Sequence, residues 1–153
     1  MTVAGAARLK VELHRLKTIE RPAVIRAIAD ARSHGDLSEN ADYDAAKERQ
    51  GFIEGRIAEI ENKLAGAQVI DPSTVDGDGR VVFGATVEIE DVEAGTRRTW
   101  RIVGDDEADV RENMVSVNSP LARALIGKEE GDSVEVQAPG GVRTYEIIAV
   151  SYD

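Results

Sequence analysis

The fold is decided by two long stretches with a helical pattern, AARLKVELHRLKTIERPAVIRAIADAR (residues 6–32) and YDAAKERQGFIEGRIAEIENKL (residues 43–64). In each stretch, apolar residues recur every three or four positions, which places them along one face of a helix. Pro22 interrupts the first stretch, and we expect it to kink the helix rather than end it, because the apolar stripe resumes at once. The predicted stripes consist of Leu9, Leu13, Leu16, Ile19, Ala23, Ala27, Ile28 and Ala31 in the first helix, and of Tyr43, Ala46, Ile53, Ile57, Ile60 and Leu64 in the second.

Each predicted helix has a single apolar stripe and a charged remainder. Two such helices joined by a short connection bury their stripes against each other, so the sequence predicts an antiparallel coiled-coil hairpin. With roughly 28 residues per helix and a rise of about 1.5 Å per residue, the hairpin should be on the order of 40 Å long. A rod of this kind is poorly suited to forming a compact core, and its length is the first indication of function.

The second half of the chain has a different pattern. Asp71-Pro72-Ser73 and Asp76-Gly77-Asp78-Gly79 are typical of a linker, and Ser119-Pro120 predicts the start of a short helix, with Ser119 as its N-cap. Short β-like runs predict one strand region that takes in residues 81–83 and 85–90, and further strands at residues 99–103, 114–117, 134–137 and 143–150. We therefore expect an α+β chain in which residues 1–75 form the hairpin and residues 76–153 form a small antiparallel sheet with one short helix.

Composition excludes several classes of protein. The 153 residues include 19 basic and 29 acidic side chains, for a net charge of −10, which argues against general binding to a nucleic-acid backbone. The absence of cysteine excludes disulfides, cysteine-ligated zinc and a thiol nucleophile. No apolar run approaches the roughly 18 residues of a membrane span, and residues 1–10 lack the apolar core of a signal peptide. We expect a cytoplasmic protein that does not enter a membrane.

The connection between the predicted helices leads into a stretch of nine residues, 36–44, that contains four carboxylates: Asp36, Glu39, Asp42 and Asp44. Asp36 and Glu39 are three residues apart, so they share one side of a helical turn. One interpretation makes Asp36 an N-cap and Glu39 its capping-box partner, which the helix dipole would also favour. The other makes them metal-binding or catalytic residues. Spacing alone favours capping, whereas the apolar Leu37 at an exposed tip favours function.

Four basic residues flank this connection: Arg26 and Arg32 on the first helix, and Lys47 and Arg49 on the second. They are either solvated charges that pair with neighbouring carboxylates or a surface that guides phosphates toward a metal. His14 and His34 are not spaced as a pair of metal ligands, so we expect a surface helix residue and a loop residue.

At this connection the sequence resembles a known family. The strings Gly35-Asp-Leu-Ser-Glu-Asn-Ala-Asp-Tyr43 and Gln50-Gly-Phe-Ile-Glu-Gly-Arg-Ile57 are similar to those of the Gre family of bacterial transcript cleavage factors. The second half agrees through Arg101-Ile-Val-Gly-Asp-Asp-Glu-Ala-Asp109, Ser116-Val-Asn-Ser-Pro120 and Leu125-Ile-Gly-Lys-Glu-Glu130. The resemblance covers nearly the whole chain.

The resemblance implies a fold like that of FK506-binding proteins for the second domain, and a docking role for it on bacterial RNA polymerase at the mouth of the secondary channel. Asn118, Ser119 and Pro120 match the part of the family pattern implicated in docking. The hairpin would enter the channel, where Asp36 and Glu39 would help the polymerase to hold a second Mg²⁺. A water oriented there would cut backtracked RNA near its 3′ end, with Arg32 and Lys47 on the RNA phosphates.

Magnesium chemistry fits this division of labour, because one or two carboxylates bind Mg²⁺ only weakly and need further oxygen ligands from elsewhere. The chain would then activate the nuclease of RNA polymerase and would not be an enzyme by itself. Three other readings remain: a channel inhibitor of the same architecture, a coiled-coil adaptor or chaperone, and a free-standing nuclease, which too few metal ligands disfavour. Prolyl isomerisation would need an aromatic pocket, and the few aromatic residues of the second half do not cluster in the sequence: Phe83, Trp100, Tyr145 and Tyr152.

Overall fold

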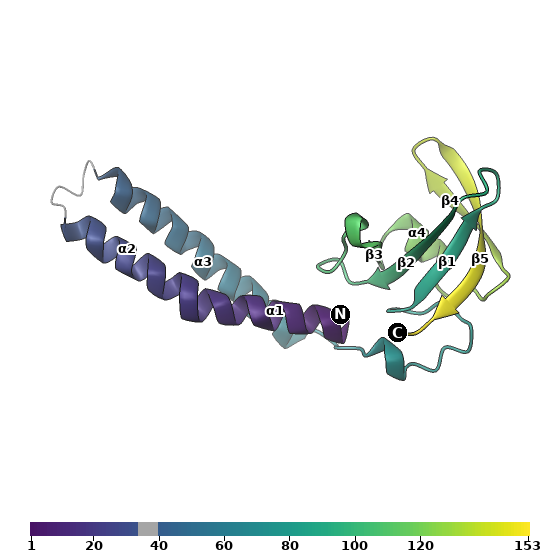
Figure 1. The fold of residues 1–153 in the computed structure, drawn as a ribbon, viewed down its shortest axis with the longest axis horizontal. Coiled ribbons are helices and arrows are strands. Elements are labelled where there is room, and N and C mark those ends of the chain that lie inside the picture. The colour runs from purple at the N-terminus through teal and green to yellow at the C-terminus, as the bar shows by residue number, and fades with distance from the viewer. Residues whose placement is uncertain (34–39) are drawn as a thin grey trace. The chain divides into compact units, whose positions relative to one another are not determined.

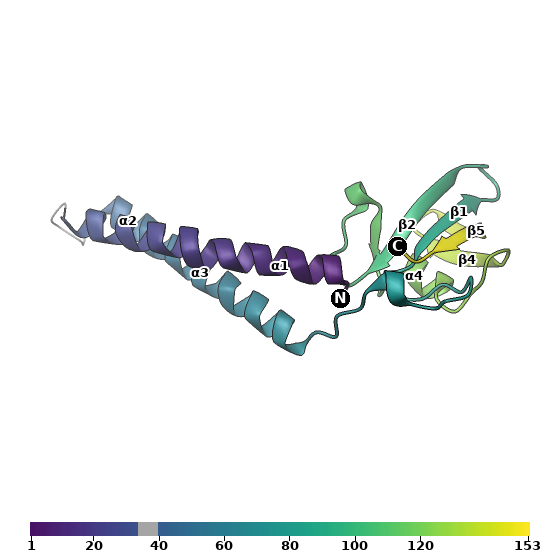
Figure 2. The same ribbon diagram turned by 60° about the horizontal axis from the view of Figure 1, so that its bottom comes forward.

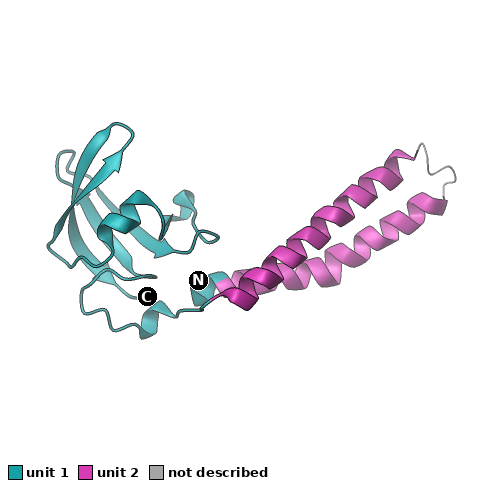
Figure 3. Cartoon of the chain, turned by 180° about the vertical axis from the view of Figure 1, so that it is seen from behind, with its two compact units in different colours: residues 1–5, 68–153 teal, residues 6–67 magenta. Residues whose placement is uncertain are grey.

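The computed structural model describes residues 1–33 and 40–153. The chain divides into two compact units (Figures 1 and 3). Ala6–Ala67 form the hairpin unit, and Met1–Gly5 together with Gln68–Asp153 form the sheet unit. Across the two described ranges, no helix combines the length and the apolar character that crossing a membrane requires.

The hairpin unit contains one long helical run and one returning helix. Helix α1 (Val3–Arg15), the π-helical turn η1 (Leu16–Glu20) and helix α2 (Arg21–Ser33) follow one another directly. Helix α3 (Ala41–Gly66) runs back along α2 in the opposite direction (Figures 1 and 2). The predicted helical hairpin is confirmed, and the first helical run continues through Pro22 as expected.

Beyond Leu16, the prediction of the buried face is confirmed only in part: Ala31 is buried as expected, but the other buried residue is Val24, which the prediction left out. Val24 is only 2% exposed, whereas Ile19 is 56% exposed, Ala27 is exposed and Ala23 is half-buried. The prediction that Ile19 and Ala27 belong to the apolar stripe was therefore wrong. The apolar contact between the helices, which we call the seam, consists of Leu13, Leu16, Val24, Ile53 and Ile57.

The π-helical turn explains this shift. The backbone N–H of Arg21 donates to the carbonyl oxygen of Leu16, five residues earlier, instead of to the usual fourth residue. At about 100° per residue, the eight steps from Leu16 to Val24 would leave Val24 about 80° away from Leu16 around an unbroken α-helix. One surplus residue in η1 removes most of that angle. The turn thus keeps Val24 on the same face as Leu16.

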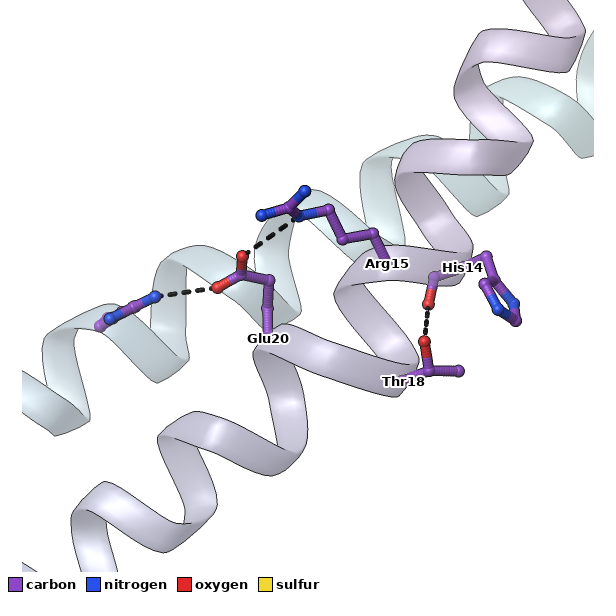
Figure 4. Close-up of polar contacts among 5 residues, drawn as sticks. His14, Arg15, Thr18 and Glu20 are labelled. Carbon is purple, nitrogen blue, oxygen red and sulfur yellow. Dashed lines mark hydrogen bonds and ion pairs between the residues drawn. The ribbon is translucent and has the colours of Figure 1, made fainter.

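Side chains brace this turn (Figure 4). The hydroxyl of Thr18 donates to the carbonyl oxygen of His14 at 2.7 Å. Glu20 accepts hydrogen bonds from Arg15, at 3.5 Å, and from Arg49 on α3, at 2.8 Å. Because Pro22 has no N–H to donate, it fits next to a turn in which the regular ladder of hydrogen bonds is already interrupted.

Ion pairs between the two antiparallel segments accompany the seam. Arg56 and Arg21 each grip both carboxylate oxygens of their partners, Glu12 and Glu54, at 2.7–2.8 Å. These hydrogen bonds lower the pKa of both carboxyl groups. Two further pairs join Lys17 to Glu61 and Glu20 to Arg49. Bidentate contacts of this kind require fixed partners, so they specify the register of the hairpin.

The sheet unit contains a five-stranded sheet in the order β3-β2-β1-β5-β4. Neighbouring strands are antiparallel except β2 and β3, which are parallel, so the prediction of a purely antiparallel sheet was wrong at β3. The cause is the crossover of residues 104–113, which carries the chain back so that β3 starts at the same end as β2. Of the first predicted strand region, residues 81–83 are not part of a strand. The elements are β1 (Thr86–Asp91), β2 (Arg97–Val103), β3 (Met114–Ser116), α4 (Pro120–Leu125), β4 (Ser133–Ala138), β5 (Gly141–Ser151) and the short 3₁₀ turns η3 (Pro72–Thr74) and η4 (Val110–Glu112).

The core of the sheet unit includes residues of the sheet and of α4. Val87 and Ile89 of β1 are buried, as their alternation with two glutamates predicts. The hydroxyl of Ser119 accepts a hydrogen bond from the N–H of Ala122 at 3.2 Å, and Pro120 is the first residue of α4, so the predicted cap is confirmed. The remaining core residues are Val81, Ala85, Trp100, Ile102, Ala122, Leu125, Val134, Val136 and Ile147.

The origin of the π-helical turn can be tested with two variants. If the seam holds the turn, Pro22→Ala alone should leave it in place, because Val24 still needs the surplus residue. Deleting the exposed Ile19 together with Pro22→Ala should produce an unbroken α-helix whose seam is intact, with a stability within about 1 kcal/mol of the parent. Nuclear Overhauser contacts around Leu16 and Arg21, with thermal unfolding followed by circular dichroism, measure both effects.

A matched control deletes the exposed Lys10 in the Pro22→Ala background, where no residue is surplus. This change turns Leu9 away from its buried position and should cost about 2 kcal/mol or more. Loss of the π-helical turn in Pro22→Ala alone would show that proline, not the seam, causes it.

Glycines within helices give a second test of the structure. Gly51 and Gly55 lie in the middle of α3, and a Cβ atom added at either position meets no atom within 4 Å. Alanine at each position should therefore stabilise the helix by about 1 kcal/mol. The same substitution at Gly5 should destabilise the protein, because its Cβ would lie 2.2 Å from the side-chain carbon Cδ of Glu107. Thermal unfolding of the three variants measures the change in stability at each position. A change of the same sign at all three positions would contradict the structure.

Candidate functional site

The carboxylates that sequence analysis singled out most strongly, Asp36 and Glu39, lie outside the described residues, as do Leu37 and His34. In the chain they belong to the connection between the end of α2 at Ser33 and the start of α3 at Ala41. The other two acidic residues, Asp42 and Asp44, lie in the first turn of α3. Negative charges at that position are favoured by the helix dipole, which gives these two a structural role.

Asn40 is the residue that caps α3. Its side-chain oxygen accepts a hydrogen bond from the N–H of Tyr43 at 3.0 Å, and its side-chain nitrogen donates to the carbonyl oxygen of Ala31 at 2.6 Å. One amide group thus joins the last turns of α2 to the first turn of α3. The N-cap of α3 is therefore Asn40, whereas the capping interpretation of Asp36 and Glu39 lies outside the described residues. Asparagine is among the preferred N-cap residues, so this role was visible in the sequence and was missed.

The four basic residues near the connection differ in their contacts. Arg49 is engaged by Glu20 on the opposite helical run. Arg32 lies with its guanidinium carbon 6.0 Å from the centre of the Tyr43 ring, and Lys47 donates to the side-chain oxygen of Gln50 at 3.1 Å. No carboxylate of the described ranges forms an ion pair with Arg32, Lys47 or Arg26. Within the described ranges, Arg49 alone of the four is bound to a carboxylate, and that contact joins the two helical runs.

Metal binding by the described part of the chain alone has little support. In residues 1–33 and 40–153, no three histidine or acidic side chains gather into a possible metal site. The donor set that the sequence offers at the connection is a pair of carboxylates, which matches the oxygen ligands that Mg²⁺ prefers but leaves most of its six positions to water or to another molecule. In chemical type the pair is compatible with Mg²⁺, but it supplies too few ligands for a complete site.

Asn118, Ser119 and Pro120 form the turn that leads from β3 into α4, and we call these three residues the docking turn. Ser119 is occupied with its cap, whereas Asn118 and Pro120 are exposed. The cap therefore involves Ser119, while its two neighbours lie exposed at the surface.

Two carboxylates of the acidic segment before β3, Glu107 and Asp109, are held by hydrogen bonds within the sheet unit. Glu107 is only 7% exposed, and its carboxylate accepts hydrogen bonds from the backbone N–H of Thr2, at 2.8 Å, and from the hydroxyl of Thr2. Asp109 caps η4 by accepting from the N–H of Arg111 at 3.0 Å. Sequence alone could not separate these anchored carboxylates from solvated ones, because their partners are distant in the chain or hidden in a short turn.

The sheet unit has a small hollow that sequence analysis missed. Trp100 on β2 and Tyr145 on β5 line it together, because both strands are neighbours of β1. Its volume is about 260 Å³, below the usual range for ligand sites of roughly 300–1,000 Å³. Asp91 at its margin is held by Arg143 and by the N–H groups of Ala94 and Glu93, and the hydrogen bond from Ala94 contributes most to lowering its pKa. The other lining residues are Ile89, Thr96, Arg98 and Leu121.

Comparison with known proteins places both halves of the chain in the same group. Residues 1–69 match the family model described as transcription elongation factor, N-terminal, and residues 76–152 match the one described as transcription elongation factor, GreA/GreB, C-terminal. Over 152 residues, the chain is 67% identical to the transcription elongation factor GreA of Verminephrobacter eiseniae and 66% identical to that of Ralstonia nicotianae. Each alignment covers 99% of this chain and 96% of the relative.

Solved structures include similar chains as well. A GreA factor homologue, Gfh1, of Thermus thermophilus is 28% identical, with a TM-score of 0.44 and coverage of 99% of this chain and 97% of the other. The transcription elongation factor GreA/GreB of Nitrosomonas europaea is 23% identical, with a TM-score of 0.45 and coverage of 99% and 98%. Given the full-length identity to its relatives and the match of both family models, the chain belongs to the GreA/GreB family of bacterial transcription elongation factors.

Proposed function

We propose that this elongation factor inserts its hairpin into the secondary channel of RNA polymerase and stimulates Mg²⁺-dependent cleavage of backtracked RNA. Release of a short 3′ fragment then restores an RNA 3′ end in register and rescues an arrested complex. One observation carries the proposal: a pair of carboxylates, Asp36 and Glu39, occurs in the connection of a long braced hairpin whose described residues offer no metal site of their own. Such a pair can complete a site on another protein but cannot replace one.

In this mechanism Asp36 and Glu39 act as metal ligands next to the catalytic centre of the polymerase. Magnesium, when bound there, activates a water and stabilises charge on the attacking and leaving oxygens of the phosphodiester. The two carboxylates orient that water, and one of them accepts its proton. The chain itself has no turnover, so we propose an activator of the polymerase's nuclease rather than an enzyme.

The basic residues beside the connection would hold the RNA. Arg32 and Lys47 lie on α2 and α3 and form no ion pair with any described carboxylate, so their charges are available to phosphates near the RNA 3′ end. The ring of Tyr43 contacts Arg32 and limits the freedom of its side chain. Phosphate contacts position a nucleic acid without reading its sequence, as a general rescue factor requires.

The sheet unit would attach the factor to the polymerase. We propose that residues 76–153 act as the docking part and residues 1–75 as the inserted part, with the docking turn at the polymerase surface. A fold like that of FK506-binding proteins is supported by the five-stranded sheet and its single short helix. The factor would work in the cytoplasm, where bacterial RNA polymerase transcribes.

Conservative substitutions test the role of the acidic pair. Asp36→Asn and Glu39→Gln should each reduce cleavage of RNA in a backtracked elongation complex by at least about 100-fold, because a metal ligand is lost. Polymerase binding and the helical circular dichroism signal should not change. Asp44→Asn is the matched control: it removes a neighbouring carboxylate from the first turn of α3 and should retain cleavage.

Two outcomes would contradict this assignment. Loss of helical structure in the Asp36 and Glu39 variants would support the capping interpretation. A parent protein that binds the backtracked complex with Mg²⁺ yet leaves its RNA intact would identify a channel inhibitor.

Charge removal tests the proposed RNA contacts. Arg32→Ala and Lys47→Ala should each weaken stimulation of cleavage by several-fold and reduce the slope of its salt dependence by roughly one unit in the logarithmic plot. Lys10→Ala removes the same charge from an exposed position on α1 and should change neither quantity. Cleavage measured at a series of salt concentrations gives both values. An unchanged slope for Arg32→Ala would remove that residue from the interface.

A further inference from the structure

A carboxylate from a neighbouring connection holds the docking turn. Asp105 follows β2, and Ser116 is the last residue of β3. Because these strands are parallel and Val103 is paired with Ser116, the chain leaves both strands at the same edge of the sheet. There the carboxylate of Asp105 accepts a hydrogen bond from the hydroxyl of Ser116 through Oδ1, and one from the side-chain nitrogen of Asn118 through Oδ2 at 2.9 Å.

Backbone hydrogen bonds complete the arrangement. The N–H of Asn118 donates to the hydroxyl oxygen of Ser116 at 3.0 Å, and the N–H of Ser119 donates to the carbonyl oxygen of Ser116 at 2.9 Å. Hydrogen bonds from Ser116 and Asn118 lower the pKa of Asp105, so its carboxyl group is ionised at neutral pH. The turn is therefore ordered before any partner is bound.

The charge of Asp105 decides how the amide of Asn118 is oriented. An ionised carboxylate has acceptors only, so the NH₂ end of the amide must face it. The amide oxygen Oδ1 then points away from Asp105, on an exposed residue, and no donor from the described ranges contacts it. We propose that Asp105 is a positioning residue for docking, which fixes the Asn118 amide so that Oδ1 accepts a hydrogen bond from a donor on RNA polymerase.

This inference rests on the docking role proposed above for Asn118. A purely structural role for Asp105 is the alternative, and the contacts of α4 argue against it. The helix is capped by Ser119 through Ala122, and Ala122 and Leu125 are fully buried in the core of the sheet unit. Neither contact involves Asp105. Removing this carboxylate should therefore free the amide of Asn118 without unfolding the helix that follows.

A double-mutant cycle with the full-length chain tests the proposal. Affinity for core RNA polymerase is measured by fluorescence anisotropy for the parent, Asp105→Ala, Asn118→Ala and the double variant. Asp105→Ala should weaken binding by about tenfold. The double variant should bind no more weakly than Asn118→Ala, because Asp105 acts only through that residue.

Three comparisons sharpen the test. Glu135→Ala removes an exposed carboxylate from β4 and should leave the affinity unchanged. Asp105→Asn keeps an acceptor for the amide and should recover part of the lost affinity. The side-chain NH₂ signals of Asn118, followed by nuclear magnetic resonance, should move in Asp105→Ala while the melting temperature stays within about 3 °C of the parent.

The outcomes separate this inference from the proposed function. Additive losses in the double variant, or full affinity in Asp105→Ala, would overturn the positioning role while leaving the docking turn in place. Full affinity in Asn118→Ala would remove Asn118 from the interface and overturn both. A fall in affinity for Asp105→Ala with unmoved Asn118 signals would also refute the inference, because the amide would then be held by something else.

Discussion

The hairpin unit depends on one geometric constraint: the seam residues of the first helical run must all lie on the face that packs against α3. Leu13, Leu16 and Val24 can all face Ile53 and Ile57 only if one residue is absorbed between Leu16 and Arg21. Burying a valine side chain contributes about 1.5–3 kcal/mol, whereas one backbone hydrogen bond contributes about 0.5–1.5 kcal/mol. A single wide turn is therefore a smaller loss than an exposed Val24.

The same turn organises the charges along the hairpin. Glu20 and Arg21, adjacent in sequence at its end, bind different partners on α3, Arg49 and Glu54. Arg49 is bound to Glu20 in this way. Arg32 and Lys47, which are nearer to the connection in the chain, form no ion pair with a described carboxylate. The basic residues of the hairpin thus divide into those that fix its register and those whose charge can serve a ligand.

Local patterns predicted the elements well, and non-local packing accounts for the errors. The two helices, the alternation of Val87 and Ile89 and the Ser119 cap all follow from neighbours in the chain. The burial of Val24 in place of Ile19 and Ala27 could not be predicted, because a three- or four-residue period does not show where a helix absorbs an extra residue. The parallel β3 and the meeting of Trp100 with Tyr145 depend on sheet topology, which the strand pattern does not encode. At the site, the capping role of Asn40 could have been predicted from its residue type, whereas its contact with Ala31 and the contacts of Asp105 appear only in three dimensions.

The amide of Asn40 joins the two helices of the hairpin directly beside the connection that carries Asp36 and Glu39. Because this one side chain ties Ala31 of the outgoing helix to Tyr43 of the returning one, the described residues supply a closure of the hairpin by themselves. The same closure would serve a factor that stimulates cleavage of RNA and one that only occupies the channel.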